Sequence, residues 1–203
     1  MSVKVKICGL TRLKDALTAL EYGADYLGFV LHPASRRYLA PEDLRELIRK
    51  LPPEAETVGV TVDLSAAENR RLRDFCRFKI VQLHGAEPPA MLDELAGMRV
   101  WKALHLETEN DLDRLSGFHA AEMILADSAA GGSGVPCDWR LAARAAATCR
   151  VALAGGITPD NVLTALAAVR PAAVDCAGGV EVAPGIKDHD KLFTLIKKVK
   201  QYE

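Results

Sequence analysis

A regular alternation of short apolar segments with longer amphipathic segments is the feature of this sequence that most restricts its fold. Eight apolar segments recur at intervals of about 25 residues, and each is followed by a stretch whose apolar residues have helical spacing. The expected strands are residues 3–8, 25–31, 57–62, 79–84, 99–104, 122–127, 150–155 and 172–177. The expected helices are residues 13–23, 41–51, 66–76, 88–97, 109–118, 139–149, 159–169 and 189–199. Eight strand-and-helix units in one chain are typical of a closed barrel.

The expected strands also indicate how the sheet is covered. Many of them are near-continuous apolar runs, which is typical of parallel strands that are covered on both faces or closed into a barrel. We therefore predict the α/β class and a (β/α)₈ TIM barrel, near the lower size limit of that fold. No linker, low-complexity tract or charge block divides the chain, so we expect a single barrel domain over residues 1–203. An open, doubly wound parallel sheet is the alternative.

Two helix starts are indicated by capping residues. The sequence SAAE at 65–68 predicts a capping box between Ser65 and Glu68. The sequence TPDN at 158–161 predicts Thr158 as the N-cap of the next helix, with Pro159 at its first position.

Composition excludes several classes of protein. The chain has 203 residues and a formal net charge of −1, so no surface for nucleic acid is expected. No apolar run is long enough to span a membrane, and the N-terminus lacks the pattern of a signal peptide. Five cysteines without a CxxC pair argue against a disulfide framework or a structural zinc site. A reducing cytoplasm is the simplest setting.

Polar residues at the carboxyl ends of the strands are the candidate site. In a parallel barrel these ends converge on one mouth, where active sites are built. Cys8, His84, Asp127 and Asp175 end the first, fourth, sixth and eighth expected strands. A thiol and a carboxylate facing each other across the mouth would make a workable acid–base pair. On residue type alone, Cys8 could equally be an inert core thiol, Asp127 a loop cap and His84 a packed histidine.

Two glycine pairs follow the last two expected strands. Gly155 and Gly156 follow the seventh strand, and Gly178 and Gly179 follow the eighth. Glycines let backbone N–H groups approach an anion, and the loops after these two strands are the usual phosphate site of such barrels. Tight turns are the alternative explanation, but two pairs at neighbouring strand ends favour phosphate binding.

The whole chain resembles phosphoribosylanthranilate isomerase, a barrel enzyme of tryptophan biosynthesis. The combination of KICG, SRRY and QLHG is the most specific part of the resemblance, whereas LAGGI is shared by many phosphate-binding barrels. The matching stretches are VKICGLT at 5–11, GADYLGFVLHPASRRYL at 23–39, VGVTV at 58–62, VQLHG at 81–85, LADS at 125–128, GGSG at 131–134, DW at 138–139, LAGGITPDNV at 153–162, VDCAGGVE at 174–181 and PGIKDHDKL at 184–192.

The resemblance implies a role for each matching position. It implies that Cys8 is the general base and Asp127 the general acid, with no metal and no cofactor. Arg37 would hold the anthranilate carboxylate, and Asp175 would face the sugar or the amine. It further implies that His84 and Gly85 line the mouth, and that backbone amides around Gly155, Gly156, Gly178 and Gly179 hold the ribose phosphate. The family includes monomers and dimers, so either a monomer or a homodimer is expected.

The implied reaction is an Amadori rearrangement of N-(5'-phosphoribosyl)anthranilate to 1-(2-carboxyphenylamino)-1-deoxyribulose 5-phosphate. Asp127 would protonate the ring oxygen, and the Cys8 thiolate would then remove the C2' proton. For turnover near pH 7 we expect the pKa of Cys8 to lie below the ordinary value of about 8.5.

Two departures and two alternatives accompany this interpretation. The last phosphate loop of the family usually carries serines, where this chain has Cys176 and Ala177, and residues 135–137 read VPC where a Lys or Thr and an aromatic are common. A non-catalytic phosphate-binding barrel would explain the glycine loops but not Cys8 and Asp127. A related sugar-phosphate isomerase would need a carboxylate at Cys8 or a set of metal ligands.

Overall fold

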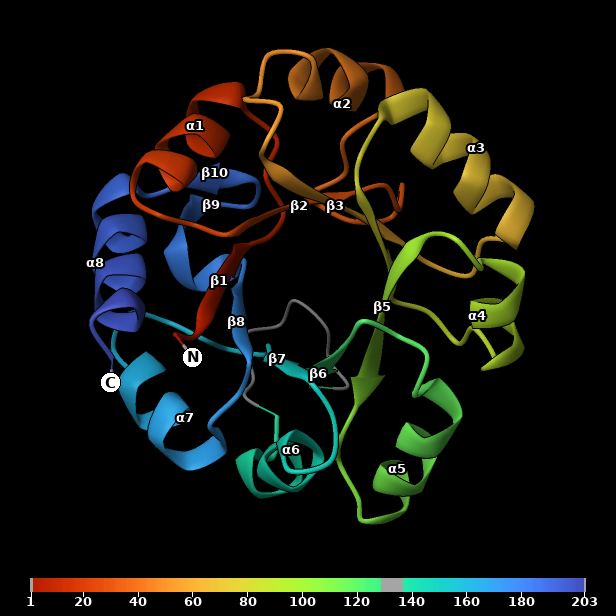
Figure 1. Ribbon diagram of the computed structural model, residues 1–203. Helices are drawn as coiled ribbons and strands as arrows, with labels where there is room; N and C mark the ends of the chain where they lie inside the picture. Colours follow the sequence, from red (N-terminus) through yellow and green to blue (C-terminus); the bar gives the residue numbers. More distant parts are fainter. Residues whose placement is uncertain (1, 129–136, 203) are drawn as a thin grey trace.

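The chain forms a closed barrel of eight parallel strands surrounded by helices, seen along the barrel axis in Figure 1. The structure is a computed structural model that describes residues 2–128 and 137–202. The strands of the barrel are β1 Lys4–Ile7, β2 Tyr26–Val30, β3 Glu56–Thr61, β4 Ile80–Leu83, β5 Arg99–His105, β6 Met123–Asp127, β7 Val151–Leu153 and β8 Ala173–Cys176. The helices are α1 Leu13–Glu21, α2 Pro41–Ile48, α3 Ala66–Cys76, α4 Ala90–Glu94, α5 Asn110–Asp113, α6 Trp139–Ala146, α7 Val162–Val169 and α8 His189–Lys200. The predicted (β/α)₈ TIM barrel is therefore confirmed.

Closure of the barrel depends on the pairing of its first and last strands. Lys6 of β1 is in register with Asp175 of β8, and Ile7 with Cys176, in a parallel ladder. An open sheet would leave both of these strands as edges, so the doubly wound alternative is wrong. The pairing also places side chains far apart in sequence beside each other, which decides the composition of the site.

Alternation along the strands divides the core into two layers. Residues that point into the barrel form one buried cluster, in which Tyr26 and Trp101 stack edge to face with ring centroids 4.8 Å apart. The larger cluster fills the space between the strands and the helices. Because side chains alternate with period two, Cys8, Asp127 and Asp175 share the inward face of their strands with this inner cluster. They lie one layer above it, at the carboxyl ends of the strands.

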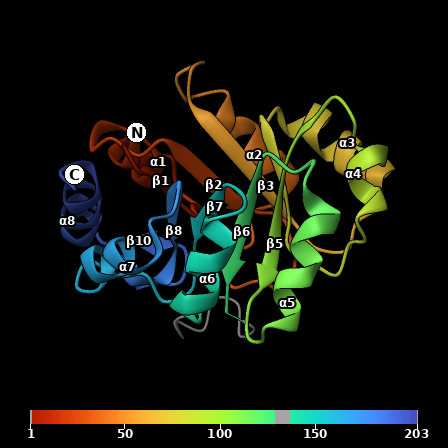
Figure 2. The ribbon, with the colours of Figure 1, turned by 60° about the horizontal axis from the view of Figure 1, so that its bottom comes forward.

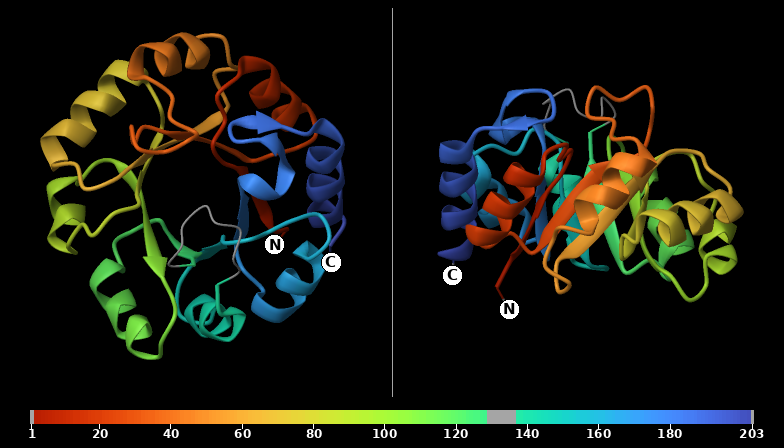
Figure 3. Two further views of the ribbon diagram at one scale, coloured as in Figure 1. Left: turned by 180° about the vertical axis from the view of Figure 1, so that it is seen from behind. Right: turned by 90° about the horizontal axis from the view of Figure 1, so that it is seen from above.

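The mouth of the barrel carries an element that the sequence pattern did not predict. After β8 the chain forms a 3₁₀ turn, η2 Gly178–Val180, and a small antiparallel pair, β9 Glu181–Ala183 and β10 Ile186–Lys187. Figures 2 and 3 show β9 and β10 beside β8, and in the right-hand view of Figure 3 both termini lie at the opposite end of the barrel.

Side-chain N-caps mark the starts of α3, α6 and α8. Ser65 accepts from the backbone of Glu68, whose side chain accepts in return from the backbone of Ser65, so the predicted capping box is confirmed. The regular part of α7 begins later than predicted, with Asn161 as its N-cap, although the carbonyl oxygen of Thr158 accepts from the N–H of Val162. The Thr158 hydroxyl accepts from the backbone N–H groups of Asp160 and Asn161, which closes a turn before the helix. The expected fifth helix is also interrupted, since α5 passes into a 3₁₀ turn, η1 Arg114–Phe118.

Among residues 2–128 and 137–202, no helix is both long enough and apolar enough to cross a membrane.

Candidate active site

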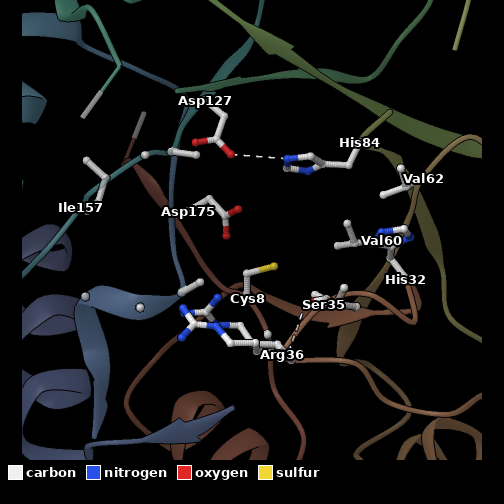
Figure 4. Close-up of a pocket in the computed structure, with 18 of the residues that line it drawn as sticks. Cys8, His32, Ser35, Arg36, Val60, Val62, His84, Asp127, Ile157 and Asp175 are labelled. Atoms are coloured by element: carbon white, nitrogen blue, oxygen red, sulfur yellow. Dashed lines mark hydrogen bonds and ion pairs between the residues drawn. The ribbon is translucent and has the colours of Figure 1, made fainter. Parts of the chain in front are cut away.

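A cavity of about 580 Å³ opens at the carboxyl ends of the strands. This volume is in the usual range for small-molecule sites. Its lining includes nearly all of the residues that the sequence indicated: Cys8, Arg37, His84, Asp127, Gly155, Gly156, Asp175, Gly178 and Gly179. Figure 4 shows the thiol of Cys8, the carboxylates of Asp127 and Asp175 and the imidazole of His84 directed into this cavity. A segment of β3 and the loop around His32 complete the opposite side.

Gly85 is the one predicted site residue that does not line this cavity. Its carbonyl oxygen accepts from Lys102 Nζ at 2.7 Å, and its N–H donates to the Glu87 carboxylate. A side chain at this position would collide with Asp63. Gly85 therefore shapes the loop that carries His84 rather than the wall of the cavity.

Asp127 ends β6 and is held mainly by its own backbone. Its Oδ1 accepts from the N–H of Ser128 at 2.8 Å. Its Oδ2 lies 3.4 Å from Nε2 of His84, whose Nδ1 lies 2.8 Å from the Gln82 amide nitrogen. Asp127 is 6% exposed, so the residue is nearly buried, and one face of its carboxylate is open to the cavity. Among the described residues, Asp127 Oδ2 has only His84 near it, at the edge of hydrogen-bond distance, which leaves this oxygen free to exchange a proton with a ligand.

Cys8 follows β1 in a more charged setting. The side chain of Lys6, two residues earlier on the same face, is fully buried and donates to Asp175 Oδ2 at 2.9 Å. The other carboxylate oxygen of Asp175, Oδ1, is buried and has no hydrogen-bond partner within the described residues. An unpaired carboxylate oxygen on the lining of a cavity is a ready acceptor for a ligand hydroxyl or N–H.

Arg37 comes from the loop after β2 and is held by an acidic residue of the β9–β10 pair. Its Nε and Nη2 donate to the two carboxylate oxygens of Glu181 at 2.8–3.1 Å. Glu181 also accepts from Lys187 Nζ at 2.8 Å, and that ammonium group donates to the backbone carbonyl oxygens of Cys8 and Ala177. The cluster of two cations and one carboxylate has a net charge of +1, which suits a monoanionic carboxylate ligand.

The two glycine loops pack against each other at the mouth. Gly155 and Gly156 both have positive φ angles, 73° and 61°, which glycine adopts without strain. A Cβ at Gly179 would stand 1.9 Å from the carbonyl oxygen of Ile157, so these loops approach as closely as backbones allow. The Cys176 thiol donates to the same carbonyl oxygen at 3.0 Å, so it takes part in loop packing where a serine hydroxyl was expected. The departure at 135–136 lies outside the described residues.

The expected lowering of the Cys8 pKa is wrong for the protein without a ligand. Burial raises the pKa of the thiol; Lys6 and, more weakly, Lys187 oppose this, whereas the Asp175 carboxylate adds to it. The net direction is upward because a thiolate loses its hydration in this setting and the nearest cation is already paired.

Three residues that hold the site residues in place were not identified from the sequence pattern: Lys6, Glu181 and Lys187. Lys6 could have been found from the alternation of side chains along the strand, since an inward Cys8 requires an inward residue two positions earlier. The others depend on contacts between distant segments. Within the described residues no cluster of His, Cys, Asp and Glu side chains has the arrangement of a metal site.

Comparisons with known proteins agree with this geometry. The profile of the family described as N-(5'phosphoribosyl)anthranilate (PRA) isomerase matches residues 5–198. An N-(5'-phosphoribosyl)anthranilate isomerase of Geobacter sulfurreducens is 44% identical over 201 residues, covering 98% of each chain. That of Thermotoga petrophila is 41% identical over 202 residues, again covering 98% of each.

Solved structures give the same result. Phosphoribosyl anthranilate isomerase of Thermotoga maritima superimposes with a TM-score of 0.91 at 39% identity, with 98% of each chain covered. A phosphoribosyl anthranilate isomerase in complex with reduced 1-(o-carboxyphenylamino)-1-deoxyribulose 5-phosphate superimposes with a TM-score of 0.89, also at 39% identity and 98% coverage of each chain. With a family profile over nearly its whole length and relatives above 40% identity, this chain belongs to the N-(5'-phosphoribosyl)anthranilate isomerase family of enzymes.

Proposed function

We propose that this chain catalyses the Amadori rearrangement of N-(5'-phosphoribosyl)anthranilate to 1-(2-carboxyphenylamino)-1-deoxyribulose 5-phosphate, a step of tryptophan biosynthesis. Family membership supports the reaction. The observation that carries the assignment of residues is the placement of one thiol, Cys8, and one carboxylate, Asp127, on the lining of a single cavity beside two glycine loops.

The two ends of the substrate are anionic and match different parts of the cavity. Backbone N–H groups of the loops at Gly155–Gly156 and Gly178–Gly179 bind the phosphate, because none of these four residues has a side chain to cover those groups, and Gly155 and Gly156 also have positive φ angles. Arg37 binds the anthranilate carboxylate through the guanidinium donors that Glu181 does not occupy. Fixing both ends places the ribose between Cys8 and Asp127.

Ring opening is the acid-catalysed step. Asp127, protonated, donates its proton to the furanose ring oxygen, and the bond between that oxygen and C1' breaks. The lone pair of the anthranilate nitrogen forms the C1'–N double bond of an iminium ion. Asp127 ends this step as a carboxylate, next to the imidazole of His84. His84 is therefore the neighbour through which the carboxylate can regain a proton before the next turnover.

Proton abstraction at C2' is the base-catalysed step. The Cys8 thiolate takes the C2' proton, and the electron pair of that C–H bond moves to the iminium carbon and nitrogen, giving an enolamine. A proton then passes from the C2' hydroxyl group to C1', which yields the aminoketone. The iminium nitrogen accepts the electrons, and the product has the atoms of the substrate. During these steps Asp175 accepts from the sugar or the amine through Oδ1, and the lack of a partner for this oxygen among the described residues supports this role.

The setting of the reaction is part of the proposal. We infer that residues 1–203 act as one barrel domain in the cytoplasm, as a monomer or a homodimer, on a small sugar phosphate. Neither a nucleic acid nor a membrane is needed for this activity.

The decisive experiment is turnover of freshly made N-(5'-phosphoribosyl)anthranilate, followed by the loss of its fluorescence. We expect turnover by the native chain and a loss of at least about a hundredfold in kcat for Cys8→Ala, the usual scale of acid–base catalysis. A non-catalytic phosphate-binding barrel would bind the substrate without consuming it. Near-native turnover by Cys8→Ala would refute the role of the thiol without refuting the activity.

A further inference from the structure

We propose that Lys6 is a positioning residue for the base: its buried ammonium group is the counter-ion of the Cys8 thiolate, and Asp175 holds it in place. The proposal deepens the proposed function and rests on the role of Cys8 as the general base. It assigns a function to a buried charge in the barrel that binding of phosphate and carboxylate leaves unexplained.

The geometry of strand β1 places the two side chains together. Lys6 and Cys8 are two residues apart and point to the same inner face. A Cβ built on Gly28 of the neighbouring strand would stand 2.8 Å from the Cys8 sulfur and 3.0 Å from Cε of Lys6. The thiol and the end of the lysine side chain thus flank one point above Gly28. Any larger residue at position 28 would push them apart.

Burying the charge of Lys6 costs free energy, and the packing of the barrel does not require a charged residue at this position. Its side chain is 0% exposed, and it makes an ion pair with Asp175, which is 8% exposed, at 2.9 Å. Buried ion pairs are often no more stabilising than apolar residues of similar volume. The inner layers of this barrel are otherwise mostly apolar, so an apolar pair at positions 6 and 175 would serve packing equally well. The pair lies directly below the thiol, and this position indicates an electrostatic role.

The charges around Cys8 act in opposite directions. Burial raises the pKa of the thiol, Lys6 is the largest influence that lowers it, and Asp175 of β8 raises it. Lys187 of β10 lowers it more weakly, and its ammonium group is already shared among three oxygens. The Arg37 guanidinium approaches from the loop after β2 and is paired with Glu181.

The pairing also suggests how a substrate assists the base. Lys6 pairs with Oδ2 of Asp175, which lines the cavity, whereas Oδ1 is buried and has no partner in the described part of the chain. His84 and Asp127 face the thiol from the other side of the same cavity. A substrate group that donates to Oδ1 neutralises part of the Asp175 charge, which leaves more of the Lys6 charge to stabilise the thiolate.

The test measures the thiol directly, in the protein without substrate. The rate at which iodoacetamide alkylates the Cys8 peptide, followed by mass spectrometry from pH 6 to pH 11, gives the pH at which the thiolate forms. We expect Lys6→Met to move this midpoint upward by at least about one pH unit, equivalent to tenfold slower labelling at a fixed pH on the rising limb. Asp175→Asn is expected to move it downward, because the Lys6 charge is then unopposed.

Two controls separate this effect from a general loosening of the barrel. Lys4→Met changes a lysine of the same strand whose side chain is 45% exposed and pairs with Asp25, and it should leave the Cys8 midpoint unchanged. Lys6→Arg keeps the charge and should keep the midpoint close to that of the native chain. If Lys6→Met does not fold, the neutral pair Lys6→Met/Asp175→Asn is compared with Asp175→Asn, and its midpoint should be at least about one unit higher.

The outcomes are distinct from those of the turnover experiment. The role of Lys6 is overturned if Lys6→Met leaves the Cys8 midpoint in place. It is also overturned if Lys6→Met and Asp175→Asn move the midpoint in the same direction. Normal turnover by Cys8→Ala would overturn the base assignment alone, since the alkylation result does not depend on turnover.

Discussion

The two walls of the cavity hold their ionisable groups in different ways. On the base wall, formed by Lys6, Cys8 and Asp175 of β1 and β8, the charged groups are paired at hydrogen-bond distance. On the acid wall, formed by His84 and Asp127 at the ends of β4 and β6, the imidazole and the carboxylate are 3.4 Å apart. A group that must hold a charge in a dry site benefits from fixed partners, whereas a group that must gain and lose a proton benefits from few. The two sides of one pocket therefore suit different protonation changes: the paired charges beside Cys8 suit a group that must become an anion, and the sparse surroundings of Asp127 suit a group that must release a proton.

The largest expected effect separates the two walls by activity and stability. Asp127→Asn keeps the shape of the side chain but removes the transferable proton, so kcat should fall at least about a hundredfold. Because Asp127 has few partners among residues 2–128 and 137–202, the midpoint of thermal unfolding should change by only a few degrees. Both expectations are checked by steady-state kinetics and thermal unfolding. Asp74→Asn, at an exposed aspartate, is the matched control. A kcat close to that of the native chain would remove Asp127 from the acid role.

The second effect concerns the arginine that joins the base wall to the β9–β10 pair. Arg37→Ala should raise KM by about tenfold to a hundredfold with a smaller change in kcat, because a charge-assisted pair to a carboxylate is lost. Arg36→Ala is the matched control, since it removes the adjacent, more exposed arginine of the same loop. If Arg36→Ala raised KM and Arg37→Ala did not, the carboxylate would be bound by the other guanidinium. The measurement is KM and kcat at saturating and limiting substrate.

Much of this site could be predicted from the sequence because its residues stand at the ends of strands. Cys8, His84, Asp127 and Asp175 end recognisable apolar runs, so barrel closure alone brings them to one mouth. Lys6 could be recognised only from Cys8: if Cys8 points into the barrel, the side chain two positions earlier points inward too. By itself, VKVKI resembles a strand whose lysines face solvent. The carboxylate that pairs with Lys6 lies 169 positions away in sequence and depends on the β1–β8 register.

Other features could not be predicted for a different physical reason. The direction of the Cys8 pKa depends on burial and on competition between Lys6 and Asp175, neither of which a strand pattern contains. Likewise, Glu181 and Lys187 act through the small β9–β10 pair, whose strands are too short to give a periodic signal.

A third, smaller effect tests whether pairing on the base side of the mouth stabilises the fold. Burial opposes ionisation of Glu181, but Arg37 and Lys187 outweigh it and hold the pKa of this carboxyl below its ordinary value. Its contribution to stability is therefore complete above the unfolded pKa of about 4.5 and is lost as pH falls through the lower, folded pKa. The free energies of urea unfolding of the native chain and of Glu181→Gln should differ more at pH 7 than at pH 3. A difference that is equal at both values would show that packing, not charge, is responsible.

The smallest effect extends the comparison to a buried thiol outside the cavity. Cys76 ends α3 and donates to the carbonyl oxygen of Pro41, and burial raises its pKa to about 11, with Glu42 adding to the shift and Arg45 opposing it. An unfolded thiol ionises near 9, so between these values the unfolded chain binds fewer protons and stability falls as pH rises. Cys76→Ala removes this dependence. The advantage of the native chain over the variant in the free energy of unfolding should shrink by about 1 kcal/mol between pH 8 and pH 10. Cys149→Ala, at a half-buried thiol, is the control and should show a smaller change. A parallel pH dependence of the native chain and Cys76→Ala would mean that the folded thiol ionises as readily as the unfolded one, and that burial is not what keeps this group neutral.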